Sequence, residues 1–131
     1  MDKKYLAKII ASDQEGLQMI SACSSGAKVK VADIKYLGSN KVFLLSIERI
    51  KIETDQEDRK IRSICRFDFV DKVQSKNIDQ SNKEMTLELI GIDYLKNNDD
   101  YEINLIFNNN AHIALTTETI EVRLEDQSEI K

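Results

Sequence analysis

Four cationic side chains on one predicted strand are the residues of this sequence whose types and spacing could do chemistry. They recur at even positions of the segment Arg59–Ser75, and they are Lys60, Arg62, Arg66 and Lys72. Alternate side chains of a strand point to one face, about 6.5–7 Å apart, so the pattern predicts a basic row that binds an acidic partner or phosphate groups. The alternative is plain solvated surface, because Asp68 and Asp71 stand close enough to neutralise the row.

Groups suited to catalysis are sparse. His112 is the one histidine, and because it follows an asparagine-rich turn we interpret it as a solvated side chain at a turn edge. Cys23 and Cys65 fall on predicted apolar faces, which is typical of core thiols. An enzyme would have to use surface carboxylates, and the candidates are Asp79, Glu118 and Glu121. Only their acidity suggests that role, so we assign no catalytic residue.

Spacings that bind metals or phosphates are missing from the sequence. One histidine, two distant cysteines and scattered carboxylates do not make a zinc or calcium site, and the four glycines are isolated, so there is no phosphate loop. We therefore expect no metal and no cofactor. The net charge of −4 argues against nucleic-acid binding, as does the lack of aromatic residues among the four cations.

The length of 131 residues predicts a single domain over residues 1–131. The apolar fraction of 41% and the charged fraction of 32% are ordinary for a globular protein with a proper core. No apolar run approaches the roughly 20 residues that span a bilayer. Without an apolar secretory start or a framework of paired cysteines, we expect a protein of the reducing cytoplasm.

A β-hairpin over Lys28–Glu53 is the clearest structural pattern. Gly38 and Asn40 can supply the positive φ of a tight turn. A two-residue turn would pair Tyr36 with Phe43, Ile34 with Leu45, and Val29 with Ile50. The apolar alternation changes phase near Ala32–Asp33 and again near Ile47–Glu48. Because a change of phase in a strand means a bulge or a bend, we expect this ribbon to curl.

The remaining pattern predicts one helix and further strands. A strand over Tyr5–Ala11 leads into a helix over Asp13–Ser24, which a Ser12–Glu15 capping box opens and Gly26 ends. Further strands are expected at Arg59–Ser75, Met85–Leu95, Tyr101–Phe107 and from Ile113 onward, with phase changes beside Gly91 and near Thr117–Thr119. Residues 119–126 are strand by propensity, with a helix as the alternative, and residues 125–131 are expected to be a frayed tail.

The expected fold is therefore mainly β, in the α+β class. About seven antiparallel strands curl into a small barrel-like or orthogonal sheet, and one helix lies between strands one and two. Repeated changes of phase favour a closed or nearly closed barrel over a flat open sheet.

Several stretches together resemble a small alphaproteobacterial family, the domain-of-unknown-function family numbered twenty-nine forty-eight. They are Ala11–Ala22, Val29–Arg49, Lys76–Gln80, Leu87–Ile92 and Ile113–Asp126. The resemblance covers nearly the whole chain and rests on core patterns, so it implies a family and no activity or cofactor. The chain departs from the family pattern at Asn77, where the family has glycine, and at Thr119, where the family commonly has cysteine.

Three hypotheses about function follow from these observations. The first is a non-catalytic interaction module of the cytoplasm, which binds another protein or a second copy of this chain. The second is a small-ligand-binding β-barrel with an open interior. The third is an enzyme that uses surface carboxylates, and it has the least support.

Overall fold

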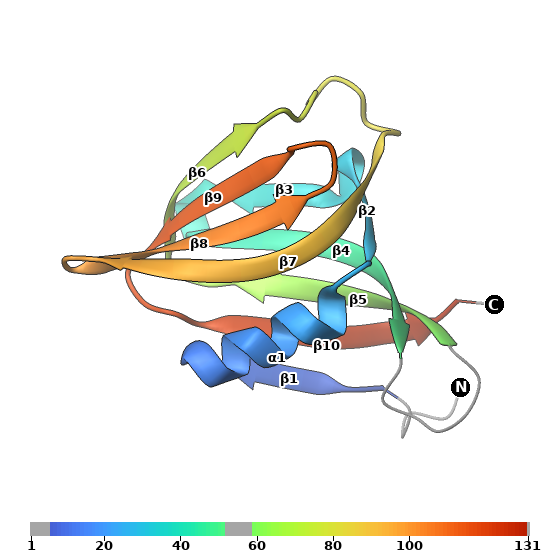
Figure 1. The fold of residues 1–131 in the computed structure, drawn as a ribbon, viewed down its shortest axis with the longest axis horizontal. Coiled ribbons are helices and arrows are strands. Elements are labelled where there is room, and N and C mark those ends of the chain that lie inside the picture. The colour runs from blue at the N-terminus through green and yellow to red at the C-terminus, as the bar shows by residue number, and fades with distance from the viewer. Residues whose placement is uncertain (1–5, 52–58, 131) are drawn as a thin grey trace.

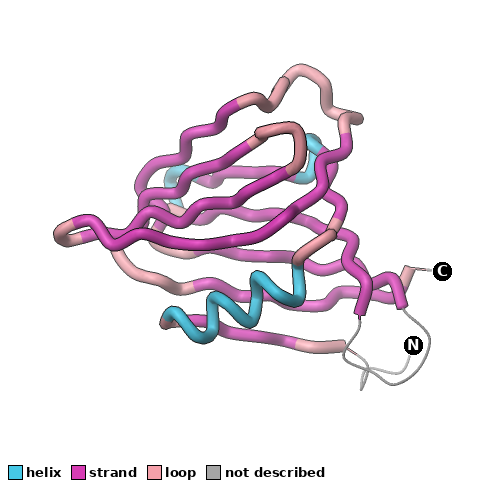
Figure 2. Tube along the Cα trace, viewed as in Figure 1, coloured by secondary structure: helices cyan, strands magenta, loops and turns pink. Residues whose placement is uncertain are grey.

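The computed structural model describes residues 6–51 and 59–130. Within these residues the protein is a single antiparallel sheet of ten strands with one α-helix (Figure 1). The expected class, mainly β with one helix between the first two strands, is confirmed. The expected count of about seven strands is too low, because three of the predicted segments each contain two strands. Figure 2 shows how much of the chain is extended.

The sheet follows the order β1-β10-β5-β4-β2-β7-β8-β9-β6, and β3 pairs with β4 beside this path. The helix is α1 (Gln14–Ser24), and the strands are β1 (Lys8–Ala11), β2 (Lys28–Lys30), β3 (Ile34–Leu37), β4 (Val42–Lys51), β5 (Arg59–Phe67), β6 (Val70–Lys76), β7 (Thr86–Asn97), β8 (Asp100–Phe107), β9 (His112–Thr117) and β10 (Val122–Glu129).

The sheet curls on itself without closing. The strand at one end of the sheet path, β6, comes round to face β3, and hydrogen bonds near Val70 hold the two together at one end. There the Val70 N–H donates to the Lys41 carbonyl at 2.8 Å, and the Tyr36 hydroxyl donates to the Val70 carbonyl at 2.8 Å. No ladder joins β3 to β6 in the described chain. Of the closed or nearly closed barrel that the sequence predicts, the curl is present, but the described sheet does not close.

Helix α1 lies between β7 and β1 and buries Leu17 and Ile20 in the core (Figure 1). Its N-cap is Asp13, whose side chain accepts a hydrogen bond from the Gly16 N–H at 2.8 Å. The predicted Ser12–Glu15 capping box is therefore displaced by one residue. The helix ends as predicted, because Gly26 has a φ of +85°, which other residues rarely adopt.

The structure confirms part of the predicted central hairpin and contradicts the rest. The pairs Tyr36–Phe43 and Ile34–Leu45 are confirmed, although Lys41 supplies the left-handed turn residue, with a φ of 55°. The first change of phase is a 3-10 turn over Val31–Asp33. That turn shifts the register, so the predicted pairing of Val29 with Ile50 does not form, and Lys28 pairs with Glu48. Residues of the predicted hairpin beyond Lys51 lie outside the described residues.

The second change of phase, expected at Ile47–Glu48, does not occur. The ladder between β4 and β5 runs unbroken from the Phe43–Phe67 pair to the Lys51–Arg59 pair. Inward positions on β4 therefore remain odd-numbered, and Arg49 occupies the next one with 1% of its surface exposed. The sequence pattern predicts that Arg49 is exposed and that Ile50 is buried. The structure shows the reverse.

The long strand predicted over Arg59–Ser75 is two strands in different parts of the sheet. β5 ends at Phe67 and pairs with β4 and β10. Phe69, with a φ of 59°, turns the chain, and β6 then pairs with β9. The bulge expected beside Gly91 is confirmed by a register shift between Leu89 and Gly91.

The C-terminal segment is ordered sheet. Of the two readings of residues 119–126, strand is correct from Val122 onward. The frayed tail expected over residues 125–131 is wrong up to Glu129, because β10 continues to pair with β5 as far as the Glu129–Ile61 pair. Asp126, which we placed in that tail, is only 6% exposed.

Candidate functional site

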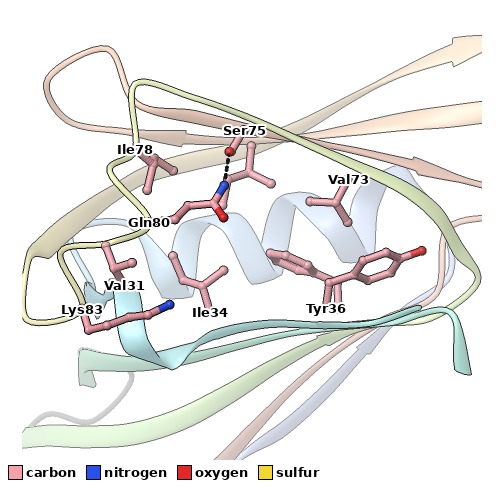
Figure 3. A pocket seen from close by; sticks show the side chains of 10 residues that line it. Val31, Ile34, Tyr36, Val73, Ser75, Ile78, Gln80 and Lys83 are labelled. Atoms are coloured by element: carbon pink, nitrogen blue, oxygen red, sulfur yellow. Dashed lines mark hydrogen bonds between the residues drawn. The ribbon is translucent and has the colours of Figure 1, made fainter. Parts of the chain in front are cut away.

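A hollow between β3 and β6 is the most site-like feature of the described chain, and we call it the slot (Figure 3). It has a volume of about 270 Å³. Its apolar walls are built from Val31, Ile34, Tyr36, Phe43, Val73, Ile78 and Ile113. Pockets that are mainly apolar with a few placed polar groups are the usual form of a binding site, and the slot has that form.

The alternation of the two facing strands positions these walls. Ile34 and Tyr36 stand two apart on β3, and Val73 and Ser75 stand two apart on β6, so each pair projects from one face of its strand. Phe43 lies deeper, 1% exposed, and belongs to the core cluster. The slot therefore leads from the surface to the hydrophobic core.

Three polar side chains lie at the slot: Ser75, Gln80 and Lys83. The Gln80 side-chain amide donates to the Ser75 hydroxyl at 3.0 Å (Figure 3). The Lys83 ammonium has no ion-pair partner among the residues that the structure describes, and Figure 3 shows the side chain at the slot wall. It is available to an anionic group of a ligand.

One end of the slot is tied by Lys41. Its ammonium lies 2.9 Å from an Asp71 carboxylate oxygen and 3.1 Å from one of Glu118. Hydrogen bonds to Asp71 and Glu118 raise the pKa of Lys41. Together with the bond from Tyr36 to Val70, these contacts hold β6 against the turn that follows β3.

A buried ionic cluster lies elsewhere, between β4, β5 and β10. The Arg49 Nη2 donates to both carboxylate oxygens of Asp126, at 3.0 and 3.1 Å, and the Ser63 hydroxyl donates to Asp126 Oδ1 at 2.7 Å. The Asp126 Oδ2 also accepts from the Ala7 N–H at 2.8 Å. Arg49 also donates to the Ser63 hydroxyl at 3.2 Å and to the Cys23 carbonyl at 3.5 Å. The cluster therefore joins the chain ahead of β1 and the helix α1 to three strands.

The electrostatics of this cluster favour an ionised Asp126. Burial opposes ionisation, but the hydrogen bonds from Ser63 and Ala7 and the charge of Arg49 outweigh it, and the pKa of Asp126 is lowered. The side chains of Arg49 and Asp126 are 1% and 0% exposed, so no substrate can reach them in this conformation. We assign the cluster a structural role.

Only three of the four cations in the predicted basic row lie on one strand. Lys60, Arg62 and Arg66 lie on the outward face of β5, whereas Lys72 lies on β6 and does not join them. In the described chain, Lys60 lies 3.8 Å from a Glu48 carboxylate oxygen, Arg62 lies 3.4 Å from the Ser46 hydroxyl, and Arg66 lies 3.0 Å from an Asp68 carboxylate oxygen. The single-strand interpretation failed because the turn at Phe69 was not recognised.

The remaining reactive side chains are not gathered into a site. His112 is half-buried, with its Nε2 2.7 Å from the Asn104 side-chain oxygen. Cys65 is fully buried, as predicted, and burial raises its pKa to about 12, which suppresses thiolate chemistry. Cys23 is half-buried and packs against the core. No group of three or more histidines, cysteines and carboxylates that could hold a metal occurs in residues 6–51 and 59–130.

Each of the three carboxylate residues considered for catalysis has a different partner. Glu118 pairs with Lys41. Asp79 accepts from the Ser81 hydroxyl at 2.6 Å, and hydrogen bonds from Ser81 lower its pKa. Glu121 accepts an N–H bond from Asp68 through its main-chain carbonyl.

Sequence reasoning missed both the slot and the buried cluster. The slot needs a facing pair of strands that are distant in sequence, which no local pattern shows. Arg49 could have been found, since it follows Phe43, Leu45 and Ile47 at the same parity, and an arginine there has to be buried with a partner if the strand continues.

The comparison with protein families bears on this geometry. A family model described as "Protein of unknown function (DUF2948)" matches residues 7–131. The chain belongs to this family. The match to DUF2948 includes both members of the buried pair, Arg49 and Asp126, and every residue that lines the slot. No curated protein and no solved structure matches the chain. Helices long and apolar enough to cross a membrane are absent from the described residues of this DUF2948 protein.

Proposed function

We propose that this protein is a non-catalytic interaction module that binds an extended segment of a partner protein in the slot. The observation that carries the proposal is the pair of strand edges at the slot: among the residues that the structure describes, β3 pairs only with β4, and β6 pairs only with β9. An unpaired edge presents N–H and C=O groups that readily accept another strand. Here two such edges face one apolar hollow.

The side chains at the slot support a peptide occupant. An extended peptide projects alternate side chains to one side, and the apolar walls of the slot would receive them while the backbone pairs with β3 or β6. Main-chain hydrogen bonds would supply affinity, and the pocket would supply specificity. Lys83 favours an acidic side chain or a C-terminal carboxylate at its end of the slot.

The test compares two tryptophan substitutions on the same strand. Ser75→Trp fills the slot, whereas Gln74→Trp places the same bulk at the adjacent exposed position, which does not line the slot. The wild type and Gln74→Trp should retain the same stoichiometric partner from a cell lysate, and Ser75→Trp should lose it. Hydrogen exchange in the isolated complex should show added protection of β3 and β6.

Equal retention by both variants would contradict the proposal, as would protection confined to other strands. Turnover of a substrate by the pure chain would contradict its non-catalytic part. The family assignment is unaffected by any of these results.

A second candidate function is the binding of a small amphipathic carboxylate in the same slot. The lone ammonium of Lys83 beside apolar walls favours it. A bound ligand raises stability by mass action, so carboxylates of four to eight carbons at millimolar concentration should raise the melting temperature of the wild type, and Lys83→Gln should reduce that rise. If the peptide function is correct and this one is not, the wild type shows no rise.

A further inference from the structure

Two arginines face each other on the outward surface of the sheet, away from the slot. Arg66 on β5 stands opposite Arg123 on β10 in the strand register. Apolar residues extend the same cross-strand row on both sides, Ile10 beyond Arg123 and Leu44 beyond Arg66. Like charges placed directly opposite each other on adjacent strands destabilise a sheet, so this arrangement has a cost for which folding alone offers no reason.

The charge of this pair is only partly neutralised by the protein. Arg66 Nε lies 3.0 Å from Asp68 Oδ1, and Arg123 Nη2 lies 3.9 Å from Asp68 Oδ2. In the described chain these are the polar side-chain contacts of both guanidinium groups, so two cations share one carboxylate. Their side chains are 44% and 37% exposed, so a ligand can reach both arginines from the solvent.

A groove of about 350 Å³ runs beside the pair. Leu44 and Ile64, both half-buried, contribute apolar surface to it, and Glu125 and Gln127 also line it. Glu125 stands opposite Lys8 in the register, and Lys35 stands opposite Leu44. Two cations and one carboxylate therefore line the groove, and Lys8 and Lys35 occupy neighbouring register positions, whereas the chain as a whole has a net charge of −4.

From these observations we propose that the outward face of β10, β5 and β4 is a second docking surface, which binds an acidic segment of a partner protein that carries an apolar side chain beside its carboxylates. The carboxylates pair with Arg66 and Arg123 in the bidentate geometry that guanidinium groups favour. The apolar side chain covers Leu44 and Ile64. The surface is independent of the slot, since the two share no residue.

The combination of arginines and apolar side chains favours an acidic peptide over free phosphate and over nucleic acid. A free phosphate would leave the apolar part of the groove uncovered. Single-stranded nucleic acid stacks its bases on aromatic side chains, and none of the residues that line this groove is aromatic. A peptide that combines carboxylates with aliphatic side chains matches both parts of the surface.

The test uses a fluorescein-labelled peptide of alternating glutamate and leucine as the probe, followed by fluorescence anisotropy. The double substitution Arg66→Gln and Arg123→Gln should weaken binding at least tenfold, and raising the salt concentration from 50 to 500 mM should weaken wild-type binding in the same direction. Lys30→Gln, an exposed lysine on β2 and outside the proposed surface, is the matched control and should change affinity less than twofold. Circular dichroism and thermal unfolding establish that each variant is folded.

Three results would overturn the proposal: no binding of the probe at 1 mM protein, equal binding of a glutamine–leucine peptide, or tighter binding of a single-stranded oligonucleotide. The slot variant Ser75→Trp separates the two proposals. It should bind the acidic probe as the wild type does, and loss of binding in this variant would place the peptide in the slot and overturn the docking surface.

Discussion

Asp126 is the residue on which the largest number of strong hydrogen bonds converge. Its carboxylate accepts from Arg49, Ser63 and the Ala7 N–H, and its own N–H donates to the Ala7 carbonyl at 2.9 Å. A buried ion pair adds little stability compared with apolar residues of the same size, but removal of one partner leaves a buried charge without compensation. The contribution of the cluster to stability should therefore become visible when one of its two charged partners is removed.

We expect Asp126→Asn to lower the free energy of unfolding by about 3–5 kcal/mol, because Arg49 would remain buried without its counter-charge. Urea denaturation measures this. Glu48→Gln is the control, since Glu48 is half-exposed and lies 3.8 Å from Lys60, and it should change stability by less than about 0.5 kcal/mol. A double variant, Arg49→Met with Asp126→Leu, should recover most of the loss. Equal costs for Asp126→Asn and Glu48→Gln would contradict the structural role of the cluster.

Asp126 should also contribute to acid unfolding. Its pKa is lowered in the folded protein, so its contribution to stability is complete above the ordinary carboxyl pKa of about 3.9 and is lost as the pH falls through the lower folded value. The wild type should lose more stability than Asp126→Asn between pH 5 and pH 2. Denaturation at each pH measures the difference, and parallel pH profiles for the two proteins would contradict the prediction.

At the scale of elements, the close approach of α1 to β1 depends on a glycine. A Cβ built on Gly16 would lie 2.9 Å from both Cα and Cβ of Ala11, and the Ala11 Cα belongs to the backbone and cannot swing away. By helix propensity alone, a glycine at this position is only a small cost to the helix. In the structure it permits the helix to pack on the strand that precedes it.

Gly16→Ala should therefore destabilise the protein by about 1–3 kcal/mol through overpacking, although alanine in an isolated helix would be favourable by about 1 kcal/mol. Gly38→Ala is the matched control. The nearest atom to its added Cβ would be Tyr36 Cε2 at 3.5 Å, which is ordinary contact. Thermal unfolding compares the two variants, and a higher melting temperature for Gly16→Ala would show that the helix and strand can separate without cost.

At the scale of the whole molecule, the sheet is held in its curled shape by few contacts between β3 and β6. The bond from the Tyr36 hydroxyl to the Val70 carbonyl is one of them. Tyr36→Phe removes this hydrogen bond and should lower the free energy of unfolding by about 1 kcal/mol. Compared with the wild type, hydrogen exchange in the variant should become faster in β6 and change less in β5, because β6 is the terminal strand of the sheet path.

Tyr101→Phe serves as the control for this prediction, since the Tyr101 hydroxyl has no hydrogen bond within the described part of the chain. It should leave the exchange of β6 unchanged. The same exchange rate in β6 for wild type and Tyr36→Phe would show that the slot is closed by other contacts.

Local sequence pattern predicted the elements well where one face of a strand is buried. The helix, the pairing of Tyr36 with Phe43, and the bulge beside Gly91 were all within reach, because each depends on neighbours in the chain. The pattern failed where a polar residue took a buried position, at Arg49, and where a bulky residue took a turn conformation, at Phe69. In both places a contact from a distant strand outweighs local preference.

The sequence by itself determined that this protein is mainly β with one helix, because alternation and capping are properties of neighbouring residues. Only the tertiary structure decided that the described sheet stays open, that β3 and β6 face each other across the slot, and that Arg66 lies opposite Arg123. Those features join residues as far apart as Ile34 and Val73, and strand order and curl, which no local preference encodes, bring such residues together.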